Sequence, residues 1–361
     1  MNSIASSHPV AAIPHPEELD QVRERIASAL NSSPRSIAVD HCRSSRSRLT
    51  LHCWGSSAGR RFFGKIFVSD PYPIQRASLL GLESLAPPSQ VRSVEDQIDF
   101  EWEMTNKLRE VGGSDRVPAP LGKCPVTKTI VWEQVSGRRL EQLIKQTGWR
   151  DPRGYRSTAA LFQAGAWLSK VHDLLPLRLA TMDFHTLMDG IPDLVQKEGW
   201  PQCAGIARKV LEETVASLHG TRELSVPVGL VHGDFNLENL IWNAKTRQLF
   251  IVDFERCGQG AISYDLVSII FCLRVKLLNP FIPKGVIELW EKSFWAGYGS
   301  IPGELRACID AQATLLSFGS FLLGLSTRKN QHGWLAASTS TVYKAFLENH
   351  LLRRRFGVDD L

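Results

Sequence analysis

Hydrophobic and polar positions along the first part of the chain follow two periods, one helical and one typical of strands. Residues 16–30 carry apolar side chains every three or four positions behind two acids, which predicts an amphipathic helix. Three runs rich in β-branched and aromatic residues follow, separated by polar turns, at 36–41, 49–54 and 61–68. The pattern predicts a lobe that begins with a β-sheet and carries the first helix on its outside.

Helical periodicity dominates after the predicted sheet. Residues 158–175 place apolar side chains at helical spacing, 98–108 predicts an acidic helix, and the apolar run 263–273 predicts a buried helix. The most apolar late segment, 315–325, is interrupted by small polar residues and is too short to span a bilayer, so it predicts a buried helix.

Two stretches are predicted to be insertions. Residues 70–96 are rich in Pro and Ser, which indicates a loop with one short helix near 77–85. Residues 176–228 are expected to form short helices ahead of the loop 232–239.

Three polar side chains in residues 231–255 have a spacing that suits phosphoryl transfer. Asp234 and Asn239 are five positions apart, and Asp253 comes fourteen positions after Asn239, directly behind the apolar run 249–252. Kinase-type enzymes use an aspartate, an asparagine and a second aspartate in this order.

The segment between these residues predicts a β-hairpin, because two apolar runs flank the polar turn 243–247. A hairpin brings its two ends together, so Asn239 and Asp253 are expected to meet. Mg²⁺ prefers hard oxygen ligands. Two such ligands beside the carboxylate of Asp234 therefore predict a magnesium–nucleotide site.

The segments HGDFNLEN (232–239) and VDFE (252–255) resemble the aminoglycoside phosphotransferase / choline kinase family, a small-molecule branch of the protein-kinase-like fold. The resemblance implies an α+β bilobal fold, with an antiparallel sheet plus a helix in the N-lobe and a larger, mainly helical C-lobe. It also implies that Asp234 is the catalytic base, that Asn239 and Asp253 hold Mg²⁺, and that Glu255 lies close to the metal site. Residues 290–299 resemble a helix that is common in the phosphotransferase branch of this family.

The same resemblance assigns Lys65, in the third strand-like run, to the α- and β-phosphates of ATP. Glu103 matches the glutamate that holds this lysine in an ion pair. Glu101 is the alternative, since residues two apart lie on different faces of a helix.

Further nucleotide contacts are implied at a turn and at a hinge. The turn 42–48, with Ser45 near its centre, corresponds to the loop over the phosphates. It lacks the glycines that are usual there, and an exposed polar turn explains it equally well. Backbone groups from Glu133 to Val135 correspond to the hinge that binds the adenine edge.

Two residues are expected to support the catalytic loop. His232 is expected to hold the shape of the loop through hydrogen bonds. A bystander role is equally compatible with the sequence. Asp265 resembles the aspartate that braces the loop by accepting backbone hydrogen bonds, and a buried aspartate needs such partners. His172 is interpreted as a packed or capping histidine and is left outside the site.

The expected domain organisation has three parts. Residues 1–35 form an extension with one helix, 36–136 the nucleotide-binding lobe, and 137–361 the lobe with the catalytic loop (232–239), the metal motif (253–255) and the substrate-binding helices. A length of 361 residues is enough for two lobes, each with its own core.

Composition narrows the class of protein further. Hydrophobic residues make up 43% and charged residues 22%, and the net charge of +5 with no nucleic-acid motif argues against a nucleic-acid partner. The seven cysteines never form a C-x-x-C pair, which indicates free, mostly buried thiols in a reducing compartment. With no signal peptide visible, a cytoplasmic location without membrane association is expected.

The function expected from these features is transfer of the γ-phosphoryl of ATP, with Mg²⁺, to a hydroxyl of a small molecule: an antibiotic, an amino alcohol, a sugar or a related metabolite. The alternatives are an atypical protein kinase and a non-catalytic nucleotide-binding scaffold. Only about ten residues separate Glu255 from Asp265, which leaves no room for the long activation segment of a protein kinase.

Charge and aromatic content bear on the acceptor. Basic residues outnumber acidic ones in 257–361, which disfavours a polycationic aminoglycoside and slightly favours a neutral or anionic metabolite. A choline site needs an aromatic cage, for which Trp290, Trp295 and Tyr298 are candidates, although aromatics at helical spacing more often form core.

Overall fold

The structure is a computed structural model of the whole chain, and it describes residues 16–45, 49–68, 72–73, 91–146, 154–175, 178–183, 223–278, 282–310, 312–314 and 317. The chain forms two compact units. Unit 1 comprises residues 1–75, 89–137 and 243–255, and unit 2 comprises 76–88, 138–242 and 256–361.

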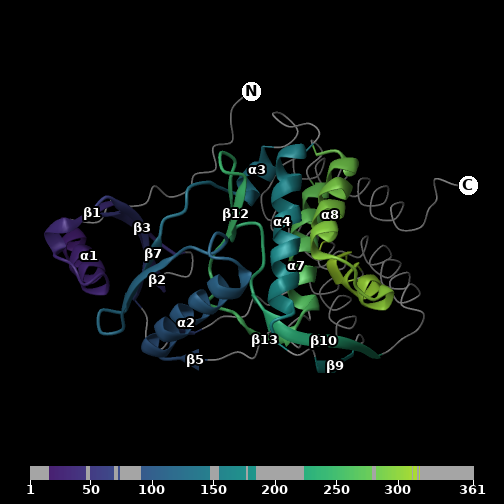
Figure 1. Cartoon of the computed structure of the whole chain (residues 1–361), viewed down its shortest axis with the longest axis horizontal. Helices are drawn as coiled ribbons and strands as arrows, with labels where there is room; N and C mark the ends of the chain where they lie inside the picture. The colour runs from purple at the N-terminus through teal and green to yellow at the C-terminus, as the bar shows by residue number, and fades with distance from the viewer. Residues whose placement is uncertain are drawn as a thin grey trace, which may run out of the picture. The chain divides into compact units, whose positions relative to one another are not determined.

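Unit 1 is built on a five-stranded sheet with the order β1-β2-β3-β7-β6 (Figure 1). All neighbouring strands are antiparallel. The strands are β1 (Ile37–Ser44), β2 (Thr50–Ser57), β3 (Arg60–Phe67), β6 (Pro120–Cys124) and β7 (Thr129–Glu133). The three strand-like runs of the sequence are thus confirmed, each with somewhat different ends.

Helix α1 (Pro16–Ala29) covers one face of this sheet, as the sequence predicted. Its apolar side chains Val22 and Ile26 join a core with Phe62 and Ile66 from β3. The helix approaches closely because β6 carries Gly122, where a Cβ atom would lie 2.0 Å from the carbonyl oxygen of Ala29.

Helix α2 (Val94–Gly112) belongs to the same unit and begins at Ser93, whose hydroxyl accepts the N–H of Asp96 at 3.0 Å. Acids in its first turn suit the positive end of the helix dipole. Val94 and Ile98 form a second core with Phe67 and Ile130 of the sheet. The shorter elements of unit 1 are η1 (Pro34–Ser36), β4 (Tyr72–Pro73), β5 (Val91–Arg92) and β12 (Gln248–Ile251).

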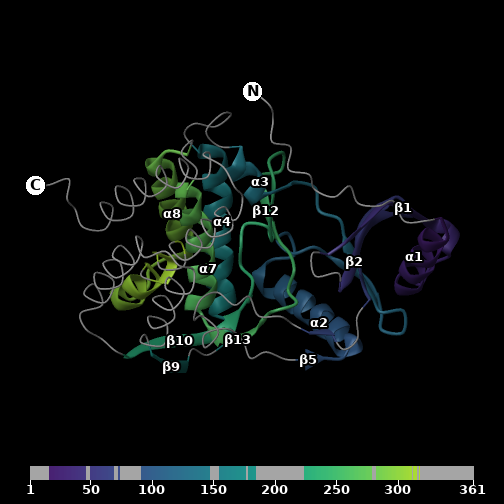
Figure 2. The same cartoon turned by 180° about the vertical axis from the view of Figure 1, so that it is seen from behind.

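Unit 2 is mainly helical. Three of its helices pack together: α4 (Tyr155–His172), α7 (Ser263–Arg274) and α8 (Lys284–Tyr298). Both views of the molecule show α4 beside α8 (Figures 1 and 2). Gly165 and Gly297 make this contact close, since a Cβ on either would lie about 2 Å from a backbone oxygen of the other helix. Residues 303–310 are also helical.

The strands of unit 2 lie on either side of the loop 232–239. Strand β10 (Glu223–Val231) pairs antiparallel with β9 (Arg178–Asp183) and β13 (Gly258–Ala261), and β11 (Leu240–Asn243) pairs with β8 (Arg138–Arg139). The remaining elements are α3 (Leu140–Lys145) and η3 (Val275–Leu278). The loop 232–239 therefore runs from the end of β10 to the start of β11.

Several predictions can be compared with these elements. The helices expected at 98–108, 158–175, 263–273 and 290–299 are confirmed as α2, α4, α7 and α8. The prediction of short helices from 176 to 228 is wrong at both ends of that stretch. Residues 178–183 form β9, and residues 223–228 form the part of β10 that pairs with it. The helices expected near 77–85 and at most of 315–325 lie outside the described residues.

Two further findings concern the membrane and the thiols. In the described part of the chain no helix combines the length and the apolar character needed to cross a bilayer. The six described cysteines are free thiols. Overall, the antiparallel sheet in the N-terminal part and the helical C-terminal part confirm the mixed α+β class.

Candidate active site

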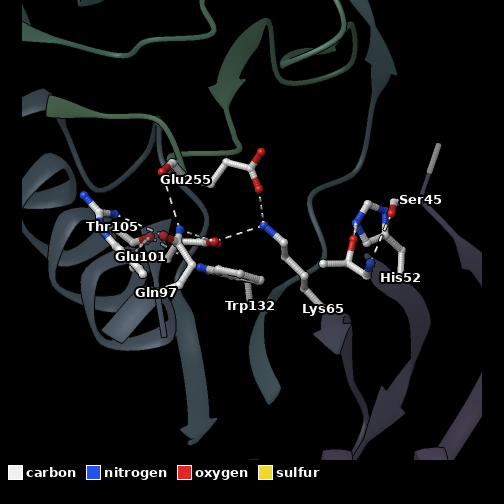
Figure 3. A network of polar contacts seen from close by, with 10 residues as sticks. Ser45, His52, Lys65, Gln97, Glu101, Thr105, Trp132 and Glu255 are labelled. Atoms are coloured by element: carbon white, nitrogen blue, oxygen red, sulfur yellow. Dashed lines mark hydrogen bonds and ion pairs between the residues drawn. The ribbon is translucent and has the colours of Figure 1, made fainter. Parts of the chain in front are cut away.

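The centre of the site in unit 1 is the ammonium group of Lys65 on β3. Its Nζ lies 2.9 Å from Oε1 of Glu101 and 2.7 Å from Oε2 of Glu255 (Figure 3). The lysine is only 4% exposed. A buried ammonium is stable when it is paired and hydrogen-bonded, and this one has two carboxylate partners.

The partner on α2 is Glu101, and the pairing with Glu103 expected from the family resemblance is wrong. Glu103 is exposed, whereas Glu101 is buried on the same face as Ile98 and Leu108. Two positions along a helix turn the side chain by roughly 200°, so the packing of this face against the sheet brings only one of the two acids to Lys65.

A residue that the sequence analysis missed holds the two acids together. The side-chain amide of Gln97 donates to Oε1 of Glu101 at 2.8 Å and to the backbone oxygen of Glu255 at 3.4 Å. Its own carbonyl accepts from Arg92 at 3.1 Å, so the amide orientation is fixed. The signal in the sequence was the spacing of four residues from Gln97 to Glu101, which places them on one helix face.

The surroundings of Glu101 act on its pKa in opposite directions. Burial raises the pKa of Glu101, the Lys65 charge opposes this, and the nearby Glu255 carboxylate raises it further. The ammonium group of Lys65 pairs with both acids, Glu101 on α2 and Glu255 after β12. These two contacts together fix its position. The arrangement offers a buried cation with a fixed position, which suits recognition of an anionic group.

Ser45 closes the turn between β1 and β2. Its N–H donates to the oxygen of Thr50 at 2.8 Å, and its hydroxyl accepts the Thr50 N–H at 3.1 Å. The remaining candidates of this turn, residues 46–48, lie outside the described part of the chain.

The predicted hinge follows β7. The N–H of Glu133 donates to Ala119 at 2.8 Å, and the N–H of Gln134 donates to Arg61 at 3.1 Å. The N–H of Glu133 is thus engaged. Its backbone carbonyl oxygen, with two lone pairs, can accept a further hydrogen bond. Val135 is half-buried just beyond these contacts.

Asp253 lies after β12 with an unusual backbone. Its φ angle is +71°, in the left-handed region that residues other than glycine rarely adopt, and its side chain is exposed. Such backbone strain concentrates at functional sites, which makes Asp253 a candidate beyond its place in the sequence pattern.

In unit 2, the carboxylate of Asp234 is held from several sides. Oδ1 accepts from the side-chain amide of Asn236 at 2.8 Å, and Oδ2 accepts from that of Asn239 at 3.1 Å. Nη1 of Arg256 lies 4.0 Å from Oδ1. The side chain remains 27% exposed, so the group is oriented but can still meet a ligand.

Asn236 is a second residue that the sequence analysis missed. Its side-chain oxygen accepts the N–H groups of Glu238 at 2.8 Å and Asn239 at 3.3 Å, which folds the loop back on itself. Asn side chains often cap turns in this way, and its position two residues after Asp234 was the available signal.

Asn239 presents a suitable metal-binding atom. Its amide nitrogen donates to the backbone oxygen and to Oδ2 of Asp234, at 2.9 and 3.1 Å. With the nitrogen side engaged, the carbonyl oxygen is the atom that could coordinate a hard cation. In the described ranges no three His, Cys, Asp or Glu side chains cluster as metal ligands.

The predicted brace is confirmed in its geometry. Asp265 on α7 is fully buried, and it accepts the N–H of His232 at 2.6 Å and the N–H of Gly233 at 2.9 Å. The ring of His232 in turn accepts the N–H of Asp234 through Nδ1 at 3.3 Å. His232 therefore shapes the loop, while its ring is enclosed by Trp167 and Phe235.

The brace extends into the helical core. Nε2 of His172 on α4 lies 3.3 Å from Oδ2 of Asp265, and Nδ1 lies 2.8 Å from the Tyr298 hydroxyl on α8. Nε2 thus faces a carboxylate oxygen that accepts, and Nδ1 faces a hydroxyl that can donate or accept. The interpretation of His172 as a packed residue outside the site is confirmed, and its contacts explain how three helices fix the loop.

Gly233 is required by the path of the loop. Its φ angle is +78°, and a Cβ there would lie 2.1 Å from the backbone oxygen of Arg256. Only glycine accommodates both conditions.

The three aromatic candidates for a choline cage are already occupied by protein contacts. Trp290 is fully buried and donates to Gly154, and the Tyr298 hydroxyl contacts His172. The guanidinium of Arg306 lies 3.7 Å from the ring centre of Trp295. These rings are core residues, as the sequence analysis favoured.

Comparison of the sequence with known proteins identifies its family. The profile described as "Phosphotransferase enzyme family" matches residues 50–308. In the curated proteins, a kinase-like protein of Caenorhabditis elegans is 31% identical over 58 residues, which is 16% of this chain and 15% of that protein.

Two solved structures share the fold. A spectinomycin phosphotransferase in complex with ADP and spectinomycin is 12% identical, with 91% of this chain and 94% of that chain covered and a TM-score of 0.51. A putative aminoglycoside phosphotransferase from Ralstonia eutropha is 12% identical, with 91% and 95% covered and a TM-score of 0.50. Since the family profile spans well over half of the chain, this protein belongs to the phosphotransferase enzyme family.

Proposed function

We propose that this protein transfers the γ-phosphoryl group of ATP to a hydroxyl group of a small molecule. The observation that carries the proposal is the Asp234 carboxylate, which is oriented by Asn236 and Asn239 and remains partly exposed. A carboxylate held in this way accepts a hydrogen bond from an alcohol and aligns its oxygen for attack.

The reaction needs no covalent intermediate on the protein. The acceptor oxygen forms a bond to the γ-phosphorus as the bond to the β–γ bridging oxygen breaks, and ADP leaves. Because the transition state is loose, the hydroxyl proton moves late, to Oδ1 or Oδ2 of Asp234. Nη1 of Arg256, 4.0 Å from Oδ1, places a positive charge beside this carboxylate.

Residues of unit 1 are assigned to the phosphoryl donor. Lys65, positioned by Glu101 and Glu255, orients the α- and β-phosphates. The Glu133 carbonyl and the backbone of Val135 bind the adenine edge, and Ser45 shapes the turn next to the phosphates.

Magnesium fits the available donors, which are the side-chain oxygen of Asn239 and the exposed carboxylate of Asp253. When bound, the ion supplies charge neutralisation on the phosphates. The left-handed backbone of Asp253 directs this carboxylate at a cost in local strain, which is consistent with a ligand role.

The acceptor is a hydroxylated small molecule: an antibiotic, an amino alcohol, a sugar or a related metabolite. The occupied faces of Trp290, Trp295 and Tyr298 disfavour a cationic head group bound by those rings. The chain passes from Glu255 through β13 into α7 with no long segment between, which disfavours a protein acceptor.

The test is ATP consumption by the purified protein with Mg²⁺ and a panel of hydroxylated metabolites and antibiotics, with mass spectrometry of the acceptor. Asp234→Asn should lower turnover by about two orders of magnitude or more and leave the melting temperature nearly unchanged. Asp173→Asn, an exposed aspartate at the end of α4, is the matched control. An Asp234→Asn protein with near wild-type turnover would falsify the assignment of the base.

A further inference from the structure

Two cysteines face each other across the first strand pair of unit 1. Cys42 on β1 and Cys53 on β2 are directly opposite in the antiparallel register, and their sulfur atoms are 3.1 Å apart. Both are buried, with 3% and 0% of their surface exposed. They lie in the core beneath α1, beside Ile26 and Phe62.

The backbone already has the geometry that a disulfide requires. Residues directly opposite in an antiparallel pair have Cα atoms about 4.5–5.5 Å apart, within the range of about 4.4–6.8 Å for disulfides. Closing the sulfur gap to a bond of about 2.05 Å needs only a small rotation of the two side chains. The irregular pairing of β1 lies at Val39 and His41, outside the Cys42–Cys53 pair.

The two thiols also differ in reactivity. The hydrogen bond with Cys53 lowers the pKa of Cys42, while the same contact and burial raise that of Cys53. Since the thiolate is the nucleophile, Cys42 is the one to react first with an oxidant. Strand β1 is at the edge of the sheet, so a small oxidant reaches Cys42 when this edge opens locally.

We propose that Cys42 and Cys53 are a modification site that hydrogen peroxide converts to a reversible cross-strand disulfide. The Cys42 thiolate attacks one peroxide oxygen, the O–O bond breaks, and one water leaves, which makes a sulfenic acid. The Cys53 sulfur then attacks the Cys42 sulfur, forms the S–S bond and releases a second water. Two thiols thus give up two electrons, and one peroxide is reduced to two waters.

The short distance between the two sulfur atoms favours a disulfide over a sulfinic acid as the product. The second sulfur is already in contact, so disulfide formation outruns further oxidation of Cys42 to the sulfinic acid. Cys124 is the contrasting thiol, because its sulfur is hydrogen-bonded to the hydroxyl of Ser28, which cannot close a disulfide. The inference concerns the chemistry of this pair alone and does not depend on the proposed function.

The test uses the full-length protein, treated with hydrogen peroxide, then alkylated with iodoacetamide under denaturing conditions and digested with trypsin without reductant. Cys42 and Cys53 fall in different tryptic peptides, 36–43 and 49–60, each with one cysteine. The expected result is a disulfide-linked pair of these peptides, absent before oxidation and lost on treatment with dithiothreitol.

Variants identify the bond and its effect. Cys42→Ser and Cys53→Ser should abolish the linked pair, and Cys124→Ser should retain it. The oxidised wild type should melt at a higher temperature than the reduced protein, because the cross-link restricts the unfolded chain. Alkylation of both peptides after oxidation, or a sulfinic acid at Cys42 with a free Cys53, would overturn the proposal. Both of these readings come from the wild type, so they hold even if a variant fails to fold.

Discussion

Lys65 is paired with Glu101 at 2.9 Å, while Glu103, one half-turn further along α2, points to solvent. The two acids differ only in the helix face that they occupy. This makes them a matched pair for testing the proposed role of Lys65 in nucleotide binding.

Glu101→Gln should raise the KM for ATP by about tenfold, equivalent to about 1.4 kcal/mol, because Lys65 loses one of its two charged partners and shifts toward Glu255. Glu103→Gln should change the KM by less than about twofold, as expected for an exposed surface residue. Steady-state kinetics with varied ATP measures both. Equal effects of the two substitutions would contradict the assigned pairing.

The choice between Glu101 and Glu103 shows what the sequence could have supplied. Val94, Ile98, Thr105 and Leu108 share one buried face of α2, and Glu101 fits their spacing whereas Glu103 does not. The spacing of the buried positions therefore indicates Glu101, whereas the resemblance to the family implied Glu103. The contact of Gln97 with the backbone of Glu255 could not be predicted, because it joins residues far apart in sequence through the tertiary packing of unit 1.

Gln97 should act as a positioning residue for this pair. Gln97→Leu removes a hydrogen bond to a charged carboxylate, worth about 1.5–3 kcal/mol, and is expected to raise the KM for ATP several-fold with a smaller change in kcat. Gln142→Leu, on an exposed face of α3, is the control and should leave both parameters unchanged. A purely structural role of Gln97 would lower the amount of folded protein without moving the KM.

Asp265 should be essential for the geometry of the loop. Asp265→Asn replaces an acceptor by a donor next to the backbone N–H of His232 or Gly233, which should cost about 1–3 kcal/mol of stability and at least about tenfold in kcat. Chemical denaturation and the kinetic assay test the two effects. Unchanged stability and turnover in Asp265→Asn, matching the exposed Asp173→Asn, would show that the brace is dispensable.

The loop 232–239 was the part of the site best predicted from the sequence. Its residues are close in sequence, so spacing alone gives their order. The family resemblance implied the brace by Asp265, and the need of a buried acid for hydrogen-bond donors supported it. The link from His172 to Tyr298 was not predictable in the same way. It depends on how α4 packs against α8, and helical spacing does not determine which buried side chains meet.

One glycine on α4 and one on α8 allow a test of the packing of unit 2. Gly165→Ala on α4 should destabilise the protein by about 1–3 kcal/mol or more, since the new Cβ would lie 2.1 Å from the oxygen of Phe294. Gly285→Ala, at an exposed position of α8 with open space around it, should be neutral or stabilising by up to about 1 kcal/mol. Thermal unfolding measures both. A similar loss of stability in the two variants would argue against the close α4–α8 contact.

The buried ion cluster of Arg274 provides the last prediction. Arg274 on α7 donates from Nε and Nη2 to the two carboxylate oxygens of Glu291 on α8, both at 3.0 Å, and Nη2 also contacts Asp310 at 2.6 Å. Arg274→Met leaves the Glu291 carboxylate buried without this partner, so a loss of about 3–5 kcal/mol is expected.

Adding Glu291→Met should recover a large part of that loss, because it removes the buried carboxylate that has lost the Arg274 guanidinium and keeps the volume. Asp310 retains its contact with Arg306 at 3.3 Å. The double-mutant cycle should therefore show a coupling of about 2 kcal/mol or more between Arg274 and Glu291. Arg306→Met, which affects a more exposed pair, should cost much less. Strictly additive losses in urea denaturation would mean that Arg274 and Glu291 stabilise α7 and α8 independently, and not through their bidentate contact.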